Sequence, residues 1–342
     1  MAAFPSLKRK KKIVCLGNPN AGLQMGRDEL RNDLLGMLHD AFAGRNDAAH
    51  LSIYFPDSLE KLDDVVEEKV KPAHPDIIAV FGGDGTLQQI LKRLLTYLKS
   101  RSNPPDILFL GLGTQNIVLK NFGLMSGDPR KAVAMLIKKI QRGIEPDRVH
   151  RMVMQINGEY PGFTYGSGIT ARFLEKYYRK KPGGPRRVFK VAVSTLWRET
   201  LGRLNPFQRQ PSLFERFGAE VTLTVNGVET RSEMSQFTGI IAGSVEQVGM
   251  NCRVTYRALE EPDAFHVVLA NLGFWQILPN VWPMFTGQPL IGDVSDAVAS
   301  KVVIKYGQPM IHMVDGELCK PEDLSDAVTI EPGPYLKLIR LT

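Results

Sequence analysis

The sequence is poor in cysteine and lacks any long apolar run. Its three cysteines, Cys15, Cys252 and Cys319, are far apart and form no CxxC spacing, which argues against a disulfide framework or a cysteine-ligated metal site. No run of about 18 apolar residues occurs that could span a bilayer. The apolar residues 13–16 behind the basic N-terminal run are too few for a secretory signal. A cytoplasmic chain with reduced thiols is expected, and contact with a membrane would be peripheral and reversible.

Internal repeats and low-complexity segments are also missing, and the composition is that of a folded protein. Of the 342 residues, 43% are hydrophobic and 23% are charged, which suits two globular domains of ordinary size. The 43 Lys and Arg exceed the 36 Asp and Glu, so the net charge is +7 and an anionic partner is favoured. No nucleic-acid-binding module is recognisable. An anionic membrane surface is therefore expected rather than nucleic acid.

Up to residue 148, short apolar runs alternate with helical periodicity. One such run, 77–81, is followed by apolar residues spaced as one face of a helix from Leu87 to Leu98. A second helix is expected at 128–141, with Pro129 in its first turn. The strand-like runs are 13–16, 51–55, 77–81 and 107–110. This alternation predicts a Rossmann-like, doubly wound α/β domain over residues 1–148.

Beyond residue 148 the pattern changes to alternating apolar and polar residues. Asn157-Gly158 and Asn226-Gly227 are strong hairpin signals. Helical insertions are expected at 169–179 and 187–201. Strand-like stretches are 152–156, 221–225, 237–242, 264–269, 302–305, 311–314 and 328–330. An antiparallel β-sandwich-like domain is predicted over residues 149–324, with the tail from about 325 to 342 a candidate to pack back on the first domain.

A glycine-rich turn stands between the third strand and its helix. Residues 81–86 read Phe-Gly-Gly-Asp-Gly-Thr, and glycines let a backbone approach a ligand closely. Free amides at a helix N-terminus favour an anion, and the carboxyl ends of parallel strands are where open α/β sheets bind ligands. The pattern predicts a phosphate site with a catalytic or metal-linked carboxylate, Asp84. The alternative is a tight turn in which Asp84 only caps the helix.

Three further polar turns are candidates for the same chemistry. Residues 17–22 and 111–116 follow the first and fourth strands, at the edge of the sheet where Asp84 is expected. The third, Val314-Asp315-Gly316-Glu317, lies in the β-rich half. Asp315 and Glu317 would suit a general base and a Mg²⁺ ligand, although Asp-Gly-Glu alone is also a common surface turn.

In this order, Asn-Pro-x-x-Gly, Gly-Gly-Asp-Gly-Thr, Gly-Thr-x-Asn and a late Asp-Gly-Glu, the chain resembles the diacylglycerol kinase catalytic family. That family includes sphingosine and ceramide kinases and bacterial lipid kinases. The resemblance runs from about residue 12 to 340. It implies ATP and Mg²⁺ as cofactors, bound in a cleft between the two domains, and transfer of a phosphoryl group to a lipid hydroxyl.

The resemblance also implies roles for individual residues. Asp315 would be the general base on the lipid hydroxyl, with Asp84 as the rival candidate, and Glu317 and Asp84 would hold Mg²⁺. The nucleotide would be bound by Asn18, Gly82, Gly83, Asp84, Gly85, Thr86, Gly113, Thr114 and Asn116.

Two departures from the family pattern affect its carboxylates. Gly-Gly-Asp-Gly-Thr continues here with Leu87-Gln88-Gln89, where the family usually has x-Asn-Glu. Ile117 stands where the family usually has Asp, a residue that joins a metal network in some bacterial members. Two alternatives to an active lipid kinase therefore stay open: a catalytically silent lipid-binding or regulatory member, and an NAD kinase-like enzyme.

The lipid itself is expected to be neutral. Arg172 stands where the resemblance puts the acidic residue of sphingosine kinases, and a cation there would repel a sphingoid ammonium. Diacylglycerol or ceramide fits better. Trp275 and Trp282 lie in an apolar stretch, 272–289, that predicts a core helix, a wall of an acyl-chain pocket or an interfacial patch. Basic residues in 176–190 suit an anionic membrane surface, and a homodimer is compatible with the sequence.

Overall fold

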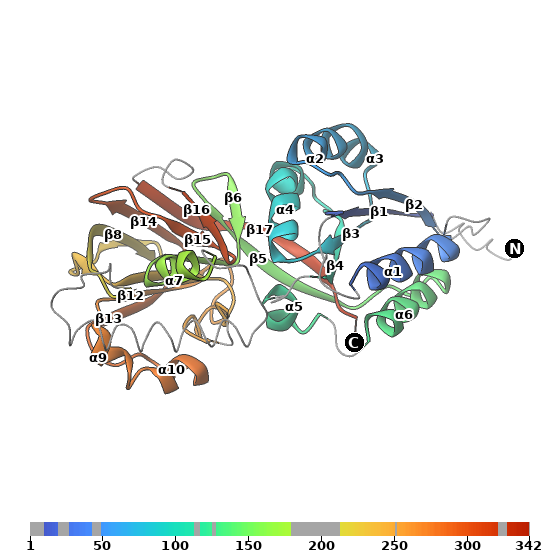
Figure 1. The fold of residues 1–342 in the computed structure, drawn as a ribbon. Coiled ribbons are helices and arrows are strands. Elements are labelled where there is room, and N and C mark those ends of the chain that lie inside the picture. Colours follow the sequence, from blue (N-terminus) through green and yellow to red (C-terminus); the bar gives the residue numbers. More distant parts are fainter. Residues whose placement is uncertain are drawn as a thin grey trace, which may run out of the picture. The chain divides into compact units, whose positions relative to one another are not determined.

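The computed structural model describes residues 10–19, 27–42, 49–112, 117–124, 128–178, 213–249, 252–320 and 327–341. The chain divides into two compact units (Figure 1). Unit 1 comprises Met1–Arg151 with Tyr335–Thr342, and unit 2 comprises Met152–Pro334. The helix expected at 187–201 lies outside the described residues.

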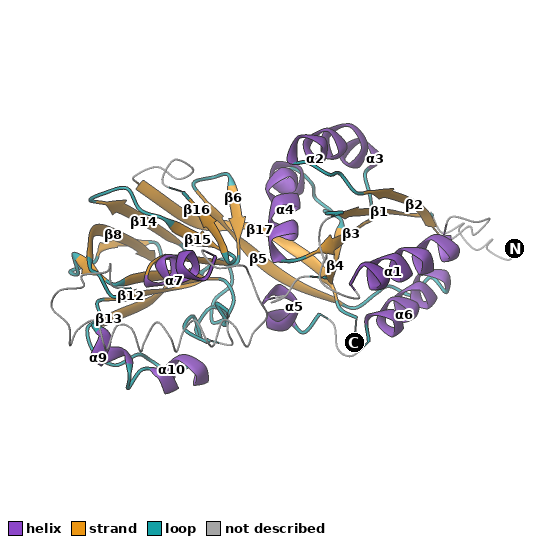
Figure 2. Cartoon of the chain, viewed as in Figure 1, coloured by secondary structure: helices purple, strands orange, loops and turns teal. Residues whose placement is uncertain are grey.

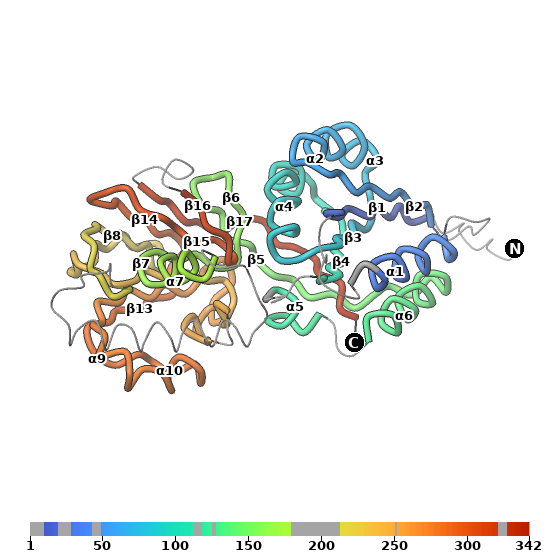
Figure 3. Tube along the Cα trace, in the orientation of Figure 1, coloured from blue at the N-terminus to red at the C-terminus, as the bar shows by residue number. Residues whose placement is uncertain are grey.

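Unit 1 is built on a parallel sheet whose strand order is β2-β1-β3-β4. The final residues of the chain add a strand at its edge, where Lys337 and Leu338 pair in parallel with Asp106 and Ile107 of β4. The red end of the chain beside β4 can be followed in Figure 3. The strands are β1 (Lys11–Gly17), β2 (Ala49–Tyr54), β3 (Ile77–Gly82) and β4 (Asp106–Gly111), with the end of β17 (Ala327–Ile339). The parallel α/β domain expected from the sequence is confirmed.

Helices cover both faces of this sheet, with α1 and α6 on one side and α2 and α4 on the other (Figure 1). The expected face of α4 is buried from Leu87 to Leu98. At the start of α6 the side chain of Asp128 accepts a hydrogen bond from the Arg130 amide, and Pro129 occupies the first turn. The helices are α1 (Arg27–Phe42), α2 (Leu59–Val65), a π-helical turn (Val66–Val70), α3 (Lys71–Ala73), α4 (Asp84–Lys99), α5 (Ile117–Phe122) and α6 (Pro129–Gln141).

Unit 2 consists mainly of strands, which Figure 2 shows in orange. One sheet has the order β13-β12-β11-β7-β15-β16, and another set has the order β10-β8-β14-β17, joined by β5, β6 and β9. These strands are β5 (Arg148–Ile156), β6 (Tyr160–Gly162), β7 (Thr164–Gly168), β8 (Phe217–Val225), β9 (Val228–Arg231), β10 (Gln236–Phe237), β11 (Gly239–Gly243), β12 (Phe265–Ala270), β13 (Val294–Ala299), β14 (Lys301–Tyr306), β15 (His312–Val314), β16 (Glu317–Cys319) and β17.

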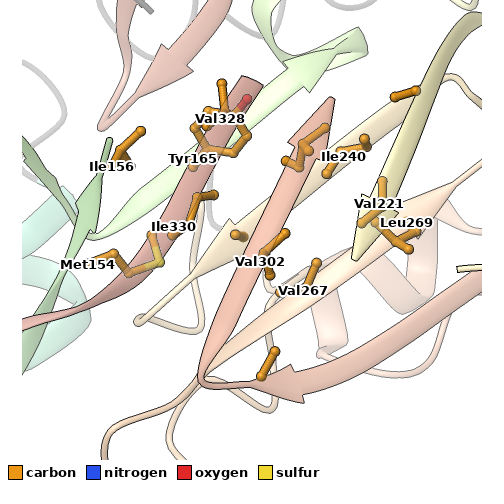
Figure 4. Packing of buried hydrophobic residues seen from close by; sticks show 14 of the residues in the cluster. Met154, Ile156, Tyr165, Val221, Ile240, Val267, Leu269, Val302, Val328 and Ile330 are labelled. Carbon is orange, nitrogen blue, oxygen red and sulfur yellow. The ribbon is translucent and has the colours of Figure 1, made fainter. Parts of the chain in front are cut away.

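The core of unit 2 lies between these two sets of strands. Val221, Val302 and Ile330 come from one set, and Ile240 and Val267 come from the other (Figure 4). All five side chains are buried, as the alternating pattern of the sequence requires of inward-facing positions. The expected antiparallel, sandwich-like arrangement is confirmed.

Each Asx-Gly pair of unit 2 forms a tight hairpin turn with positive φ at both positions. The φ angles are 50° and 76° at Asn157-Gly158 and 51° and 76° at Asn226-Gly227. Asp315-Gly316, with 49° and 84°, joins β15 to β16 in the same way. Two positive φ angles match a type I′ turn, which suits the right-handed twist of paired strands.

The described part of unit 2 contains three short helices. Helix α7 (Ile169–Tyr178) confirms the helix expected at 169–179. Helices α9 (Phe274–Ile277) and α10 (Val281–Thr286) occupy the apolar stretch that carries Trp275 and Trp282. Within the described part of the chain, no helix is long and apolar enough to cross a bilayer.

Candidate functional site

The candidate site residues of unit 1 gather where β1, β3 and β4 end. Gly17 is aligned with Phe81, and Gly82 with Gly111. Two backbone hydrogen bonds tie the turns together just beyond these strands. The Asn18 amide donates to the Phe81 carbonyl at 3.3 Å, and the Leu112 amide donates to the Gly82 carbonyl at 2.7 Å. The described starts of the three polar turns, at residues 17–18, 82–83 and 111–112, therefore lie side by side.

Helix α4 begins directly behind the glycine-rich turn. Gly83 is its N-cap and makes no side-chain capping bond, so the amides of the first turn are not capped by that residue. Asp84 is the first helical residue, where a negative charge is stabilised by the helix dipole. Its Oδ1 accepts a hydrogen bond from the Val118 amide of α5 at 3.2 Å. Asp84 thus connects the starts of two helices at the carboxyl edge of the sheet.

Packing explains why position 82 is a glycine. A Cβ atom there would lie 2.4 to 2.7 Å from the Thr86 side chain, closer than such contacts occur. Position 17 is similarly filled, because a Cβ would lie 2.8 Å from the Phe81 carbonyl oxygen. These two glycines therefore allow close packing within the protein, of Gly82 against Thr86 and of Gly17 against Phe81. Thr86 covers Gly82 and fixes the first turn of α4 on the end of β3.

The two glutamines that depart from the family pattern have distinct surroundings. Gln88 is buried, whereas Gln89 is partly exposed and its Oε1 accepts a hydrogen bond from Arg93 Nη1 at 2.9 Å. Arg93 also forms an ion pair with Asp63, with 2.7 Å between Nε and Oδ1. Arg93, one helical turn further along α4, therefore holds the side-chain amide of Gln89 in place.

In unit 2, the Asp315 carboxylate lies at the centre of a set of hydrogen bonds. The Phe163 amide donates to Oδ1 at 2.9 Å and to Oδ2 at 3.0 Å. Thr164 donates to Oδ1 twice, from its amide at 2.7 Å and from its hydroxyl at 3.1 Å. The Asp315 amide in turn donates to the Thr164 carbonyl at 3.0 Å. Donors of this kind stabilise the charged form of a carboxylate and fix its position.

Helix α7 packs against the same turn. The Tyr178 hydroxyl donates to the Gly316 carbonyl at 3.0 Å. Burial, and to a smaller extent the nearby Glu317 carboxylate, raise the pKa of Tyr178 to about 12, so the hydroxyl stays protonated as a donor. Glu317 itself is exposed at the start of β16. The Asp315-Gly316 turn is therefore held from two sides, by the backbone of residues 163–164 and by α7.

A buried polar network lies behind Asp315 on β7 and β15. The Tyr165 hydroxyl is 2.7 Å from the Tyr306 hydroxyl and 2.8 Å from His312 Nδ1. The Tyr306 hydroxyl donates to the Ser167 hydroxyl at 3.0 Å. Burial lowers the pKa of His312 to about 4, so the ring is neutral at physiological pH. This network fixes the two strands that carry Thr164 and the turn at Asp315.

The other expected site residues fall into two groups. Gly113, Thr114 and Asn116 lie outside the described residues. Arg172 is described: its Nη1 donates to the backbone carbonyls of Leu213 and Glu215, and burial lowers its pKa. Its guanidinium thus holds the chain at 213–215.

The carboxylates expected to hold a metal belong to different units, Asp84 to unit 1 and Glu317 to unit 2. Across the parts of the chain that the structure describes, no group of three or more His, Cys, Asp and Glu side chains is arranged around a common point.

Sequence reasoning missed the groups that hold the two carboxylates. Thr164, the Phe163 amide and the Val118 amide are far from Asp315 and Asp84 in sequence. Backbone donors leave no residue signature, so no signal pointed to Phe163 or Val118. Thr164 lies in an alternating run, Phe163-Thr164-Tyr165, where a single buried polar residue between aromatics could have been noted.

The chain thus has an α/β unit with a glycine-rich turn at the start of α4 and a β-sandwich-like unit with a hydrogen-bonded aspartate, Asp315. Residues 12–149 match the family described as the diacylglycerol kinase catalytic domain. The resemblance to that family, indicated by the motifs, is thereby confirmed. Among curated proteins, none matches the sequence at a significant level.

Solved structures with the same fold come from Bacillus anthracis str. Sterne. One candidate diacylglycerol kinase has a TM-score of 0.64 at 17% identity, covering 97% of this chain and 98% of its own. Another has a TM-score of 0.63 at 17% identity, covering 96% and 97%. A structure named as a diacylglycerol kinase has a TM-score of 0.58 at 15% identity, also covering 96% and 97%. At these identities the likeness shows the fold, and it extends over both units.

Proposed function

We propose that the protein is an ATP-dependent lipid kinase that transfers the γ-phosphoryl group to a hydroxyl of a neutral lipid such as diacylglycerol or ceramide. The observation that carries the proposal is the glycine-rich turn of residues 82–86. It ends β3 and begins α4, within the stretch that matches the diacylglycerol kinase catalytic domain. The carboxyl end of a parallel strand and the amides at a helix N-terminus both favour the binding of a phosphate group.

The nucleotide would be bound by the backbone of this turn. The amides of Gly83, Gly85 and Thr86 are the candidates for its phosphates, because they lie at or next to the start of a long helix. Asn18 lies beside them, bonded through its amide to Phe81. Gly113, Thr114 and Asn116 are proposed for the same site from the sequence pattern.

Mg²⁺ fits the donor chemistry of the proposed site. Asp84 of unit 1 and Glu317 of unit 2 are each proposed as a ligand, because carboxylate oxygens are the ligands that this ion prefers. The negative charge of Asp84 would repel a neighbouring triphosphate, and a Mg²⁺ ion between them would offset this repulsion. When bound, the ion would neutralise charge on the transferred phosphoryl group.

Asp315 is proposed as the general base. Phosphoryl transfer passes through a loose transition state, so the acceptor proton leaves late and a strongly basic group is not required. What the residue must provide is a fixed position, and its bonds to Phe163 and Thr164 supply that. Asp84 remains the rival, and its bond to Val118 suits a group that positions the nucleotide and metal.

A neutral lipid is proposed as the acceptor on the basis of Arg172. Its guanidinium lies in α7, the helix that packs on the Asp315 turn. A cation in that helix disfavours a positively charged sphingoid base and leaves neutral glycerolipids and ceramide acceptable.

One alternative is supported by a specific observation. Gln89 replaces a carboxylate of the family pattern and is engaged by Arg93, so a catalytically silent, lipid-binding member is the second candidate. Binding of lipid without phosphorylation would support it. Phosphorylation of NAD in place of any lipid would instead indicate an NAD kinase-like enzyme.

The test is incubation with labelled ATP and Mg²⁺ against a panel of diacylglycerol, ceramide, sphingosine, phosphatidylglycerol and NAD. We expect label in diacylglycerol or ceramide, and a fall in turnover of about 10²- to 10⁴-fold for Asp84→Ala. Asp147→Asn is the control, because it removes an exposed carboxylate that pairs with Lys139 and lies next to Arg148, which contacts Asp106 at the opposite, amino end of β4. Unlabelled lipids with the wild-type chain, or normal turnover in Asp84→Ala, would contradict the proposal.

A further inference from the structure

An exposed apolar surface lies on the short helices α9 and α10 and the turn behind them. We propose that this surface docks on the neutral interfacial region of a lipid bilayer. Its largest side chains are those of two tryptophans, 61% exposed at Trp275 and 71% at Trp282. The remaining large apolar side chains of this surface, here called the α9–α10 patch, are Leu278, Val281, Phe285 and Ile291.

The patch is a fixed surface rather than a loose end. On its inner side, Phe274 is buried among Leu213 and Phe214, with a ring-to-ring distance of 5.5 Å to Phe214. Trp275 packs edge-on against Phe274 at 4.9 Å between ring centroids. Met284 packs against a second buried cluster in the β-sheet. Apolar residues therefore occupy both sides of these helices. The inner side packs against buried residues of unit 2, and the outer side is exposed.

Three polar side chains of this surface form hydrogen bonds within the chain. Asn280 is fully buried, donates to the carbonyls of Gln276 and Ile291, and accepts from the Ile291 amide. The Gln276 side chain accepts from the Gly273 amide, and the Thr286 hydroxyl donates to the Trp282 carbonyl. A surface that enters a medium of low polarity needs such internal pairing, because an unsatisfied group there costs several kcal/mol.

Charge distinguishes a bilayer from a protein partner. Residues 271–292 contain no charged side chain, in a chain whose net charge is +7. A protein interface usually makes about one hydrogen bond per 100–200 Å² and has a polar rim, whereas the polar side chains just described are already used. Neutral lipid at the level of the glycerol groups is complementary to such a strip, and tryptophans are the residues that favour that level.

The area of the patch also disfavours a second copy of the chain. With about 150–250 Å² for a whole aromatic side chain, the measured exposures give on the order of 600 Å² for the patch. A standard stable interface requires about 800 Å² from each partner. The patch is thus large for a monomer surface and small for a dimer.

Binding to vesicles in the absence of ATP tests this inference separately from the kinase reaction. The wild-type chain should co-sediment with phosphatidylcholine vesicles and show a blue shift of tryptophan emission. The double variant Trp275→Ser and Trp282→Ser should lose at least about tenfold in partition coefficient, from the apolar area removed. The matched control is Val228→Ser with Leu259→Ser, which removes exposed apolar side chains of the same unit outside the patch.

Circular dichroism and the thermal midpoint establish that both double variants are folded. If the double variant is unfolded, Trp282→Ser alone replaces it, because this side chain is 71% exposed, and it should lose at least about threefold in partition coefficient. The inference is overturned by any of three results. These are equal partition of the tryptophan and control variants, binding of wild type to anionic vesicles alone with loss at high salt, or a concentration-dependent dimer that the tryptophan variant abolishes.

Discussion

Replacing Asp315 by asparagine separates its structural role, which its hydrogen bonds show, from its proposed role as the general base. The carboxylate accepts hydrogen bonds at both oxygens from Phe163 and at Oδ1 from Thr164. An asparagine can keep its oxygen towards Thr164, but its NH₂ group then faces the Phe163 amide at about the 3.0 Å now measured to Oδ2. Two donors would oppose each other, and the negative charge that strengthens the other bonds would be lost.

The expected cost in stability follows from these bonds. A hydrogen bond to a charged group contributes about 1.5–3 kcal/mol, so Asp315→Asn should lower the free energy of unfolding by roughly 2 kcal/mol. With a urea dependence of about 1–3 kcal/mol per molar, the midpoint should fall by roughly 1 M. Turnover should fall further, by about 10²- to 10⁴-fold, if the carboxylate is the base.

Urea denaturation and labelled-ATP turnover on one preparation provide the two readouts. Thr164→Val is the companion variant, since it removes one donor to Oδ1, keeps the volume of a side chain that is 1% exposed, and leaves the carboxylate in place. It should lose stability by about 1–3 kcal/mol but retain turnover within about tenfold. An unchanged urea midpoint in Asp315→Asn would refute the anchoring role, and unchanged turnover would refute the base.

Three further predictions concern packing and titration. Gly82→Ala should lower the free energy of unfolding by about 1–3 kcal/mol in urea titrations, because its Cβ would collide with Thr86; an unchanged midpoint would contradict this contact. Burial lowers the pKa of His312 from 6.5 to about 4, so the unfolded chain takes up a proton first, and stability present above about pH 6.5 should fall towards about pH 4, by up to roughly 3 kcal/mol. His312→Asn should show a flatter pH dependence of the urea midpoint, and an equally steep one would exclude His312 as its cause. Cys15 is fully buried, which raises its pKa to about 12, so a thiolate-specific reagent at neutral pH should label it only after denaturation; rapid labelling of Cys15 in the native chain would show that it is accessible.

Much of the fold could be predicted because local pattern and tertiary position agree. The strand 77–81 and the helical face from Leu87 to Leu98 are buried as expected. Asn157-Gly158 forms the tight turn that its residues favour. Strand β7 (Thr164–Gly168) was not predicted, because its two glycines and short length give a weak strand signal, and its five residues are buried through pairing on both sides.

The candidate site was predictable in its residue types and only partly in its geometry. Asp84 and Asp315 could be recognised in the sequence because each is next to glycine. Asp84 begins α4, and Asp315 lies in a hairpin turn. The donors that hold them are backbone amides brought in by long-range strand pairing, which no local pattern encodes. The exposure of Trp275 and Trp282 could not be predicted from hydrophobic periodicity either, because apolar residues occupy both faces of those short helices.

The last described strand has a consequence for biosynthesis. The end of β17 completes the sheet of unit 1, although residues 152–334 separate it from the rest of that unit. During translation, at about 5–20 residues per second, synthesis of the intervening unit 2 takes roughly 10 to 40 seconds, and β4 has no partner on this side until then. For that interval the growing chain presents an unpaired strand edge, which makes its early half a natural client for chaperones.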